Sequence, residues 1–178
     1  MIISVEKAKT LIDFNGWTDE KIEMKLKSIE QTIRAYTNNN FQDRGCRVQA
    51  WIKAGVIMSE ALIPFEVGDT VQISESRYNK GLFTVASVPD DLAFTLVEDV
   101  KDEDDDVLVT KIVYPPDVID CCVNMLEWEH RNRAKVGIQS ETLSRHSVTY
   151  FNMGAADSVM GYPASLLGCL KAYRKAGF

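Results

Sequence analysis

An apolar stripe along residues 18–38, which ends at three successive asparagines, constrains the fold of this chain most. Steps of four and three residues separate its members, which are Ile22, Leu26, Ile29, Ile33 and Tyr36. That spacing places them on one face of a helix. Thr18 is a good N-cap, and the asparagines at 38–40 end the helix because Asn tolerates the left-handed conformation. A helix with one narrow apolar face needs a second element to cover it.

Three more segments have helical patterns. Residues 5–14 form a short helix that ends at Asn15-Gly16. Residues 117–135 follow two prolines, and their broad apolar arc indicates a central, buried helix. Residues 163–175 form a terminal helix that begins at Pro163. Its apolar face is Leu166, Leu167, Leu170 and Tyr173, and its basic end is Lys171, Arg174 and Lys175.

The pattern changes between residues 47 and 114, where short runs rich in Val, Ile, Thr and Phe alternate with turns. The runs at 71–73, 82–88, 92–97 and 107–114 predict strands. Several short strands at such spacing are typical of a small β-barrel or a curled sheet. A further short strand is predicted at residues 147–151.

Together these patterns predict an α+β fold. We expect a small α-helical bundle of three to four helices, formed by residues 1–46 and 115–178, with an inserted small β-barrel-like subdomain at residues 47–114. In this arrangement the helices at 18–38, 117–135 and 163–175 pack together, because each has an apolar stripe that needs cover.

Composition excludes several classes of protein. A net charge of −6 and a pI of about 5.0 argue against a general nucleic-acid binder, which needs a basic footprint. The same charge suits a wall past which DNA slides without sticking. No run of about 18 apolar residues is present, so no membrane span is expected. Residues 1–7 lack the features of a signal peptide, so we expect a protein of the cytosol.

The residues that usually carry chemistry do not form a recognisable site. Neither His130 nor His146 stands in a triad or a metal-ligand spacing, and no phosphate-binding or dinucleotide-binding glycine loop is present. The acidic run at 98–106 lacks the central Gly of a calcium loop and is expected to be a solvated hairpin tip. The four cysteines form no CxxC pair and are expected to be small buried residues. We therefore expect no catalytic residue, no metal and no cofactor.

Four segments in a fixed order resemble the head–tail connector proteins of long-tailed bacteriophages and prophages. They are Thr32–Gln42, Tyr114–Val118, Ser147–Phe151 and the stretch that contains Gly161, Tyr162, Pro163, Leu167, Leu170, Tyr173 and Arg174. The strand-rich region, with its Val67–Val71 and Asn79–Val85 runs, is similar to a region found in some prophage connectors.

The resemblance implies a structural role in the virion. Connectors of this kind form a ring with copies of themselves, typically dodecameric, beneath the portal protein. The ring extends the DNA channel and presents a surface to the tail or to the next head-completion protein. The resemblance thus implies four partners: the chain itself, the portal, the next completion or tail protein, and DNA that passes without specific contact. It implies assembly in the bacterial cytoplasm, with no membrane partner and no cofactor.

Two sets of residues are candidates for the assembly interface. The terminal helix supplies Leu166, Leu167, Leu170, Tyr173, Arg174 and Lys175 as a portal-facing or neighbour-facing element. The alternative is that its apolar face covers the core of its own subunit. The small polar loop at 152–160, represented by Gly154, Asp157 and Ser158, is expected to be mobile until neighbouring subunits order it.

Two other functional classes stay open. One is a small cytosolic, non-enzymatic module that binds a protein or ligand through its β-rich region. The other is a small enzyme of unrecognised type. Portal and major capsid genes beside this gene would favour the connector, whereas a stable monomer that carries a bound metabolite would favour the other two.

Overall fold

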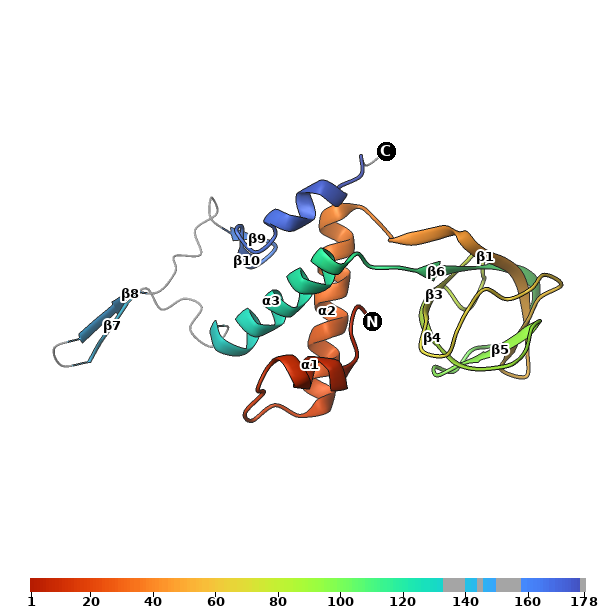
Figure 1. Cartoon of the computed structure of the whole chain (residues 1–178), viewed down its shortest axis with the longest axis horizontal. Helices are drawn as coiled ribbons and strands as arrows, with labels where there is room; N and C mark the ends of the chain where they lie inside the picture. Colours follow the sequence, from red (N-terminus) through yellow and green to blue (C-terminus); the bar gives the residue numbers. More distant parts are fainter. Residues whose placement is uncertain (133–139, 144–145, 150–157, 177–178) are drawn as a thin grey trace. The chain divides into compact units, whose positions relative to one another are not determined.

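The computed structural model describes residues 1–132, 140–143, 146–149 and 158–176 (Figure 1). The helices are α1 (Val5–Leu11), α2 (Asp19–Thr37), α3 (Pro116–Asn132) and the 3-10 helix η2 (Gly168–Tyr173). The strands are β1 (Gln42–Lys53), β2 (Val56–Met58), β3 (Thr70–Ser74), β4 (Gly81–Asp90), β5 (Ala93–Leu96), β6 (Glu103–Ile112), β7 (Ser140–Leu143), β8 (His146–Thr149), β9 (Ser158–Val159) and β10 (Tyr162–Pro163).

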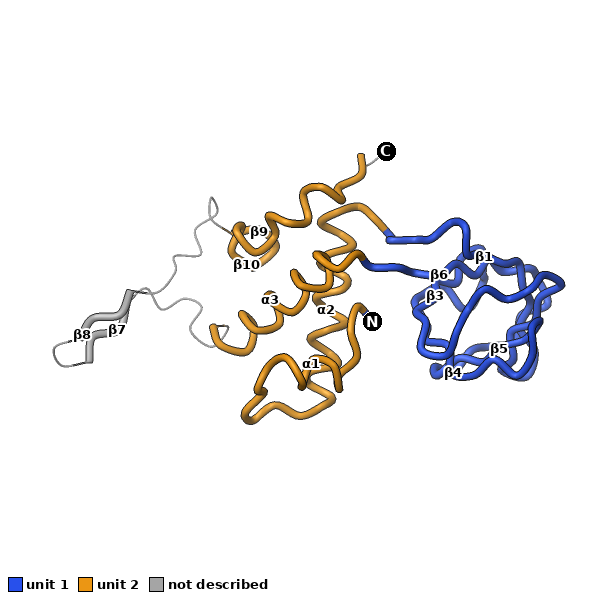
Figure 2. The backbone as a smooth tube through the Cα atoms, in the orientation of Figure 1, with its two compact units in different colours: residues 1, 40–114 blue, residues 2–39, 115–178 orange. Residues whose placement is uncertain are grey.

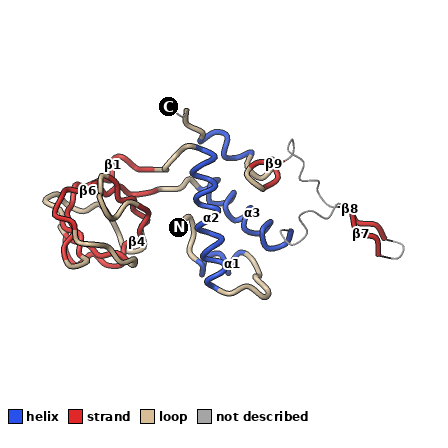
Figure 3. The backbone as a smooth tube through the Cα atoms, turned by 180° about the vertical axis from the view of Figure 1, so that it is seen from behind, coloured by secondary structure: helices blue, strands red, loops and turns tan. Residues whose placement is uncertain are grey.

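The chain divides into two compact units (Figure 2). Unit 1 consists of Met1 and Asn40–Tyr114, and unit 2 consists of Ile2–Asn39 and Pro115–Phe178. The strands of unit 1 form one barrel, whereas unit 2 holds the helices and the two short strand pairs β7–β8 and β9–β10 (Figure 3).

Helix α2 organises unit 2, and its predicted boundaries are confirmed. The Thr18 hydroxyl accepts a hydrogen bond from the Lys21 amide and caps the start of the helix. Asn38 ends it in the left-handed conformation, with φ 46° and ψ 37°. Four members of the predicted stripe are buried, at Ile22, Leu26, Ile29 and Ile33, whereas the fifth, Tyr36, is half-buried.

The core of unit 2 forms where α3 and η2 pack against α2. Helix α3 buries Val118, Cys121, Cys122, Met125 and Leu126. Lys25 of α2 also reaches the buried carboxylate of Glu129 at 2.9 Å, so an ion pair joins the two helices. Breaking such a pair would leave a buried charge without compensation.

Unit 1 is a closed antiparallel barrel with the strand order β1-β2-β5-β4-β3-β6. Its interior is filled by apolar side chains, which include Ala50, Ile52, Ile57, Val71, Ile73, Val107 and Val109. Phe94 is fully buried and meets Phe65 edge to face, with ring centroids 5.3 Å apart. Closure leaves no free sheet edge in the barrel.

The pairing of β1 with β6 closes the barrel. Val48 lies opposite Val109, and Ala50 lies opposite Val107. The register shifts between Gln42 and Arg47, where the Asp43 carboxylate accepts a hydrogen bond from the Gly45 amide at 2.9 Å. Such an irregularity bends the strand and increases its twist, as a barrel wall requires.

The predicted fold class is wrong. The structure is a mixed α+β protein with a closed six-stranded antiparallel barrel and a few helices, about 32% helix and 32% strand, and it is not a helical bundle with an inserted subdomain. Bundle packing needs several long helices with complementary stripes. Here α1 has 7 residues, and the chain after Pro163 has no α-helix among the described residues.

The terminal helix predicted at 163–175 illustrates the physical reason. Tyr162 and Pro163 pair with β9 instead, and a 3-10 helix begins at Gly168. Pro163 cannot donate an amide hydrogen bond, and Gly168 weakens an α-helix at its centre. The leucine spacing was compatible with a helix but did not require an α-helix.

Other expectations had mixed outcomes. The strands predicted at 71–73, 82–88, 92–97 and 107–114 are confirmed as β3, β4, β5 and β6, with shifted ends. Strand β1 was missed. Cys121 and Cys122 are buried as expected, whereas Cys46 is half-buried and Cys169 is exposed.

We predict that Ile29→Ala and Leu126→Ala each lower the free energy of unfolding by about 2–5 kcal/mol, because the side chains of Ile29 on α2 and Leu126 on α3 are both fully buried. Urea titration followed by circular dichroism measures this loss. Met24→Ala on the exposed face of α2 is the control and should change stability by less than about 0.5 kcal/mol. A loss below about 1 kcal/mol at both core positions would contradict the packing.

A second prediction concerns Thr110 of β6, which is fully buried and whose hydroxyl has no hydrogen-bond partner among the described residues. Replacing an unpaired buried hydroxyl with a methyl group removes a desolvation cost, so Thr110→Val should stabilise unit 1 by about 1 kcal/mol. Thr37→Val is the matched control and should destabilise, because the buried Thr37 hydroxyl donates to the Ile33 carbonyl at 2.7 Å. Equal effects at the two positions in urea titrations would refute this account.

Candidate functional site

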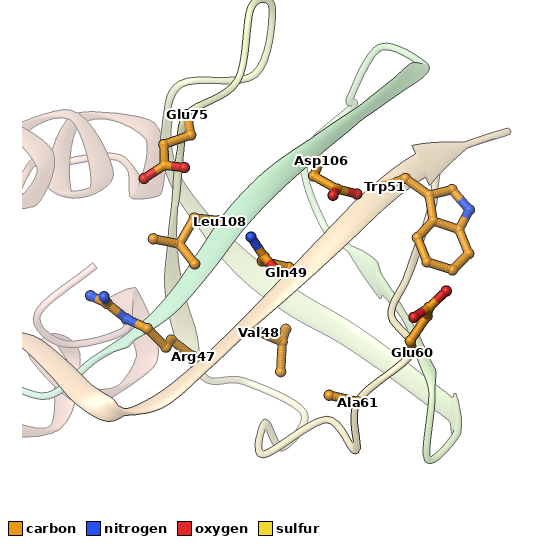
Figure 4. Close-up of a pocket in the computed structure, with 9 residues that line it drawn as sticks. All are labelled: Arg47, Val48, Gln49, Trp51, Glu60, Ala61, Glu75, Asp106 and Leu108. Carbon is orange, nitrogen blue, oxygen red and sulfur yellow. The ribbon is translucent and has the colours of Figure 1, made fainter.

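A groove on the outer wall of the barrel has a volume of about 740 Å³ (Figure 4). Strand β1 supplies Arg47, Gln49 and Trp51 to its lining, and β6 supplies Asp106 and Leu108. Glu60 follows β2 and Glu75 follows β3, so four separate segments of unit 1 converge on it. We call this feature the barrel groove.

Strand periodicity explains why these side chains point outward. Along β1, Val48, Ala50 and Ile52 are buried, and the residues between them face the other way. On β6, Leu108 alternates with the buried Val107 and Val109 and lies opposite Gln49 in register. The alternation from Arg47 to Lys53 was the signal that could have revealed the missed strand, although it does not show which other segments complete the groove.

The charged groups of the groove are uncompensated. The side chains of Arg47, Glu60, Glu75 and Asp106 are exposed, and the described part of the chain offers them no ion pair or hydrogen bond. The groove lining therefore carries three carboxylates and one guanidinium. Figure 4 shows the carboxylates of Glu60 and Asp106 directed toward the Trp51 indole, which is half-buried.

This combination fits a cationic group. An indole face attracts Lys and Arg side chains through its quadrupole, and flanking carboxylates add charge-assisted hydrogen bonds. Leu108 adds apolar surface for the stem of a long side chain. The groove therefore has the chemistry of a surface that binds basic side chains of a protein.

A buried carboxylate holds one border of the groove in place. Glu103 at the start of β6 accepts hydrogen bonds from the Ser76 hydroxyl at 2.6 Å, from the Asn79 amide side chain at 3.0 Å and from the Arg77 backbone amide. Asn79 in turn bonds both backbone groups of Lys101. These contacts fix the loop that begins at Glu75, which has a φ of 58°.

The hydrogen bonds also set the charge state of Glu103. Burial by itself would raise the pKa of this carboxyl group. The hydrogen bonds from Ser76, Arg77 and Asn79 outweigh burial and hold the pKa below its ordinary value. Glu103 is therefore ionised at neutral pH, and its charge contributes to the order of the loop.

A second feature, in unit 2, joins segments far apart in the sequence, and we call it the asparagine junction. The Asn39 side chain donates to the Tyr173 carbonyl at 3.3 Å, and the Asn38 side chain donates to the Ala176 carbonyl at 3.0 Å. The Lys175 amide donates to the Thr37 carbonyl at 2.8 Å. The end of α2 thus holds the C-terminal segment.

Tyr173 extends this junction to α3. Its hydroxyl donates to the Asp117 carboxylate at 2.7 Å, and that hydrogen bond raises the pKa of Tyr173. The triple asparagine, the start of α3 and the C-terminal segment therefore meet in one place. Three of the four segments that resemble connectors contribute to it.

The structure separates the predicted interface residues into two groups. Leu167 and Leu170 are buried in unit 2, so the apolar face mainly covers its own core. Leu166 and Tyr173 are half-buried, and Arg174 and Lys175 are exposed. The Arg174 guanidinium lies 5.3 Å from the centre of the Tyr36 ring. The structure therefore leaves the basic end of this segment available to a partner.

The predicted loop falls mostly outside the described residues. Gly154 and Asp157 lie in residues 150–157, which the structure does not describe. Ser158 belongs to β9, which pairs with β10, and it is half-buried.

The cysteines, His130 and the acidic run, which the sequence offered as possible reactive or metal-binding groups, are part of the folded framework. Burial raises the pKa of the Cys122 thiol to about 12, and burial likewise raises the pKa of Cys121, so both are poor nucleophiles at neutral pH. His130 packs edge to face against Phe14 and Trp17. The acidic run continues into β6 rather than forming a free tip, and the described residues contain no group of three ligands suited to a metal ion.

Comparison of the sequence with protein-family models gives no match, and neither does comparison with curated proteins. Among the described residues, no helix has the length and apolar character needed to cross a membrane.

We predict that Glu103→Gln lowers the free energy of unfolding of unit 1 by about 1–3 kcal/mol at pH 7, because an amide cannot accept from all three donors. The pKa of Glu103 is lower in the folded chain than in the unfolded one, so its contribution is present above the unfolded pKa and is lost as pH falls through the folded pKa. The difference between wild type and variant should therefore shrink in acid.

Urea titrations at pH 7 and at about pH 3 measure this difference. Asp104→Asn is the control, since Asp104 is exposed on the same strand. A pH-independent difference between wild type and the Glu103 variant would show that the ionised carboxylate contributes nothing.

Proposed function

We propose that the protein is a non-enzymatic structural adaptor of the phage head–tail connector kind. In this proposal it forms a ring beneath the portal protein, extends the DNA channel and joins the filled head to the tail or to the next head-completion protein. Its location is the head–tail junction of the virion, after assembly in the bacterial cytoplasm.

The observation that carries the proposal is the asparagine junction. Each connector-like segment taken alone is a local signal, such as a helix stop or a proline at a helix start. In the structure, Asn39 bonds the carbonyl of Tyr173, and the Tyr173 hydroxyl bonds Asp117. Three of the resembling segments thus act as one structural unit, which favours a common origin for the set over chance likeness.

The barrel groove supports the same function from a different side. An adaptor must bind other proteins on several faces, and its contacts gain specificity from complementary charge. The groove displays a half-buried Trp51 and four charged groups without partners in the described chain. A strongly acidic chain also avoids binding the DNA backbone, so DNA passes such a wall without being held.

The groove also favours a second candidate, a small cytosolic module that binds a basic protein segment and has no role in a virion. Trp51 with Glu60 and Asp106 would serve that function equally well. The two candidates differ in genetics, because loss of a free-standing binding module leaves particle assembly intact.

We predict that deleting this gene from the phage or prophage that carries it yields DNA-filled heads without joined tails. Electron microscopy of lysates and counts of infectious particles measure the defect. A plasmid copy of the wild-type gene should restore tailed particles, and a copy with an early stop codon is the matched control that should not. Normal numbers of tailed, infectious particles after deletion would refute the connector function.

A further inference from the structure

We infer that the barrel groove of one copy binds the basic C-terminal strip of a second copy. The strip consists of Lys171, Arg174 and Lys175. In the proposed ring, the groove and the strip would form the interface between neighbouring subunits. The role of this contact in a virion rests on the proposed function. The contact itself rests on charge, exposure and the shape of the groove.

Charge is distributed unevenly between the two units. Unit 1 carries 7 lysines and arginines against 14 aspartates and glutamates, a net charge of −7. The remainder of the chain carries 13 against 12, a net charge of +1. Two copies therefore attract each other when unit 1 of one faces unit 2 of the other, and they repel when two barrels meet.

The basic strip groups three of the 13 lysines and arginines of unit 2 within five positions of the chain. Lys171, Arg174 and Lys175 are all exposed, and within residues 1–132 and 158–176 no carboxylate forms an ion pair with them. Other basic residues of unit 2 form ion pairs within that unit, such as Lys9 with Asp19 and Arg131 with Glu127. The strip is thus a cationic surface that the described chain leaves uncompensated.

The strip is also held in place before binding. The Lys175 amide bonds the Thr37 carbonyl at 2.8 Å, and Asn39 bonds the carbonyl of Tyr173. Arg174 lies on the ring of Tyr36. A preordered segment loses less conformational entropy on binding than a free tail, so three charges on a fixed backbone bind more tightly than the same charges on a flexible chain.

The groove offers complementary groups to this strip. Its carboxylates Glu60 and Asp106 point toward Trp51, and Glu75 lies on a loop fixed by Glu103 (Figure 4). A lysine or arginine that enters beside Trp51 meets an aromatic face and two carboxylates at once.

Different surfaces of the two copies meet in this contact. When the contact is not reciprocated, one groove and one strip stay free at the ends, so it generates a closed ring or an open filament. Two copies that exchange both contacts instead form a two-fold dimer. Because the attraction involves exposed charges, salt weakens it.

Sedimentation velocity of the full-length chain at about 50 mM and about 500 mM NaCl tests the contact. We expect association that rises with protein concentration at low salt and weakens at least about tenfold at high salt. A wild-type chain that stays monomeric at low salt up to about 0.5 mM protein would overturn the proposal.

Charge reversal identifies the surfaces. The groove variant carries Glu60→Lys, Glu75→Lys and Asp106→Lys, and the strip variant carries Lys171→Glu, Arg174→Glu and Lys175→Glu. Each variant alone should associate at least about tenfold more weakly than wild type. Association should return when the groove variant is mixed with the strip variant, and also in a chain that carries all six changes, because the reversed charges are again complementary. The control is Asp91→Lys with Asp99→Lys and Asp105→Lys, which changes the net charge of unit 1 by the same amount at exposed positions outside the groove. It should retain association.

Rescue keeps the test decisive even if one reversed variant is unstable, because a poorly folded chain is not restored by reversing charges elsewhere. Association that neither reversal weakens, or that the control weakens equally, would overturn the proposal. Loss in both variants without rescue in the mixture or in the six-change chain would also overturn it, and would indicate a different occupant of the groove. If gene deletion leaves tails normal while rescue succeeds, the connector function fails and the contact between copies stands.

Discussion

The end of α2 is the point on which the organisation of both units depends. Asn38 adopts the left-handed conformation there, so the helix stops and the chain turns toward the barrel. The same short segment uses its remaining hydrogen-bonding groups to hold the C-terminal residues at Tyr173 and Ala176. An alanine in place of Asn39 would lose the side chain that makes one of these contacts. A helix stop that any glycine could supply thereby becomes a structural junction.

The barrel shows how closure produces a binding surface. The pairing of β1 with β6 sends the small and branched side chains inward and leaves Gln49, Trp51 and Leu108 outside. The groove is therefore a consequence of strand alternation at the closing seam, and the Glu103 hydrogen bonds fix its border. The order of this border depends on the ionised carboxylate of Glu103, which is one of the acidic residues of unit 1.

Local patterns predicted the elements that depend on a repeat. The stripe of α2 and the alternation of Val71 and Ile73 follow from side-chain periodicity alone, so they were readable in the sequence. Strand β1 was not predicted, because Asp43 to Cys46 interrupt its alternation and the strand becomes regular after Arg47. The contact of the Asn39 side chain depends on Tyr173, which lies more than 100 positions away in the chain, so no window of sequence contains it. The groove was missed for the same reason, since four separated segments build it.

The uneven charge of the two units determines which contacts each can make with another copy of the chain. A barrel with a net charge of −7 cannot pack against a copy of itself without compensation, whereas unit 2, with +1, can lie beside either sign. Self-association of this chain therefore favours contacts between unlike units. In the proposed ring, closed symmetry would require that the angle per subunit divide a full turn. The residues that connect α2 to β1 and β6 to α3 would then influence the size of that ring, although they contribute little to the charge that drives association.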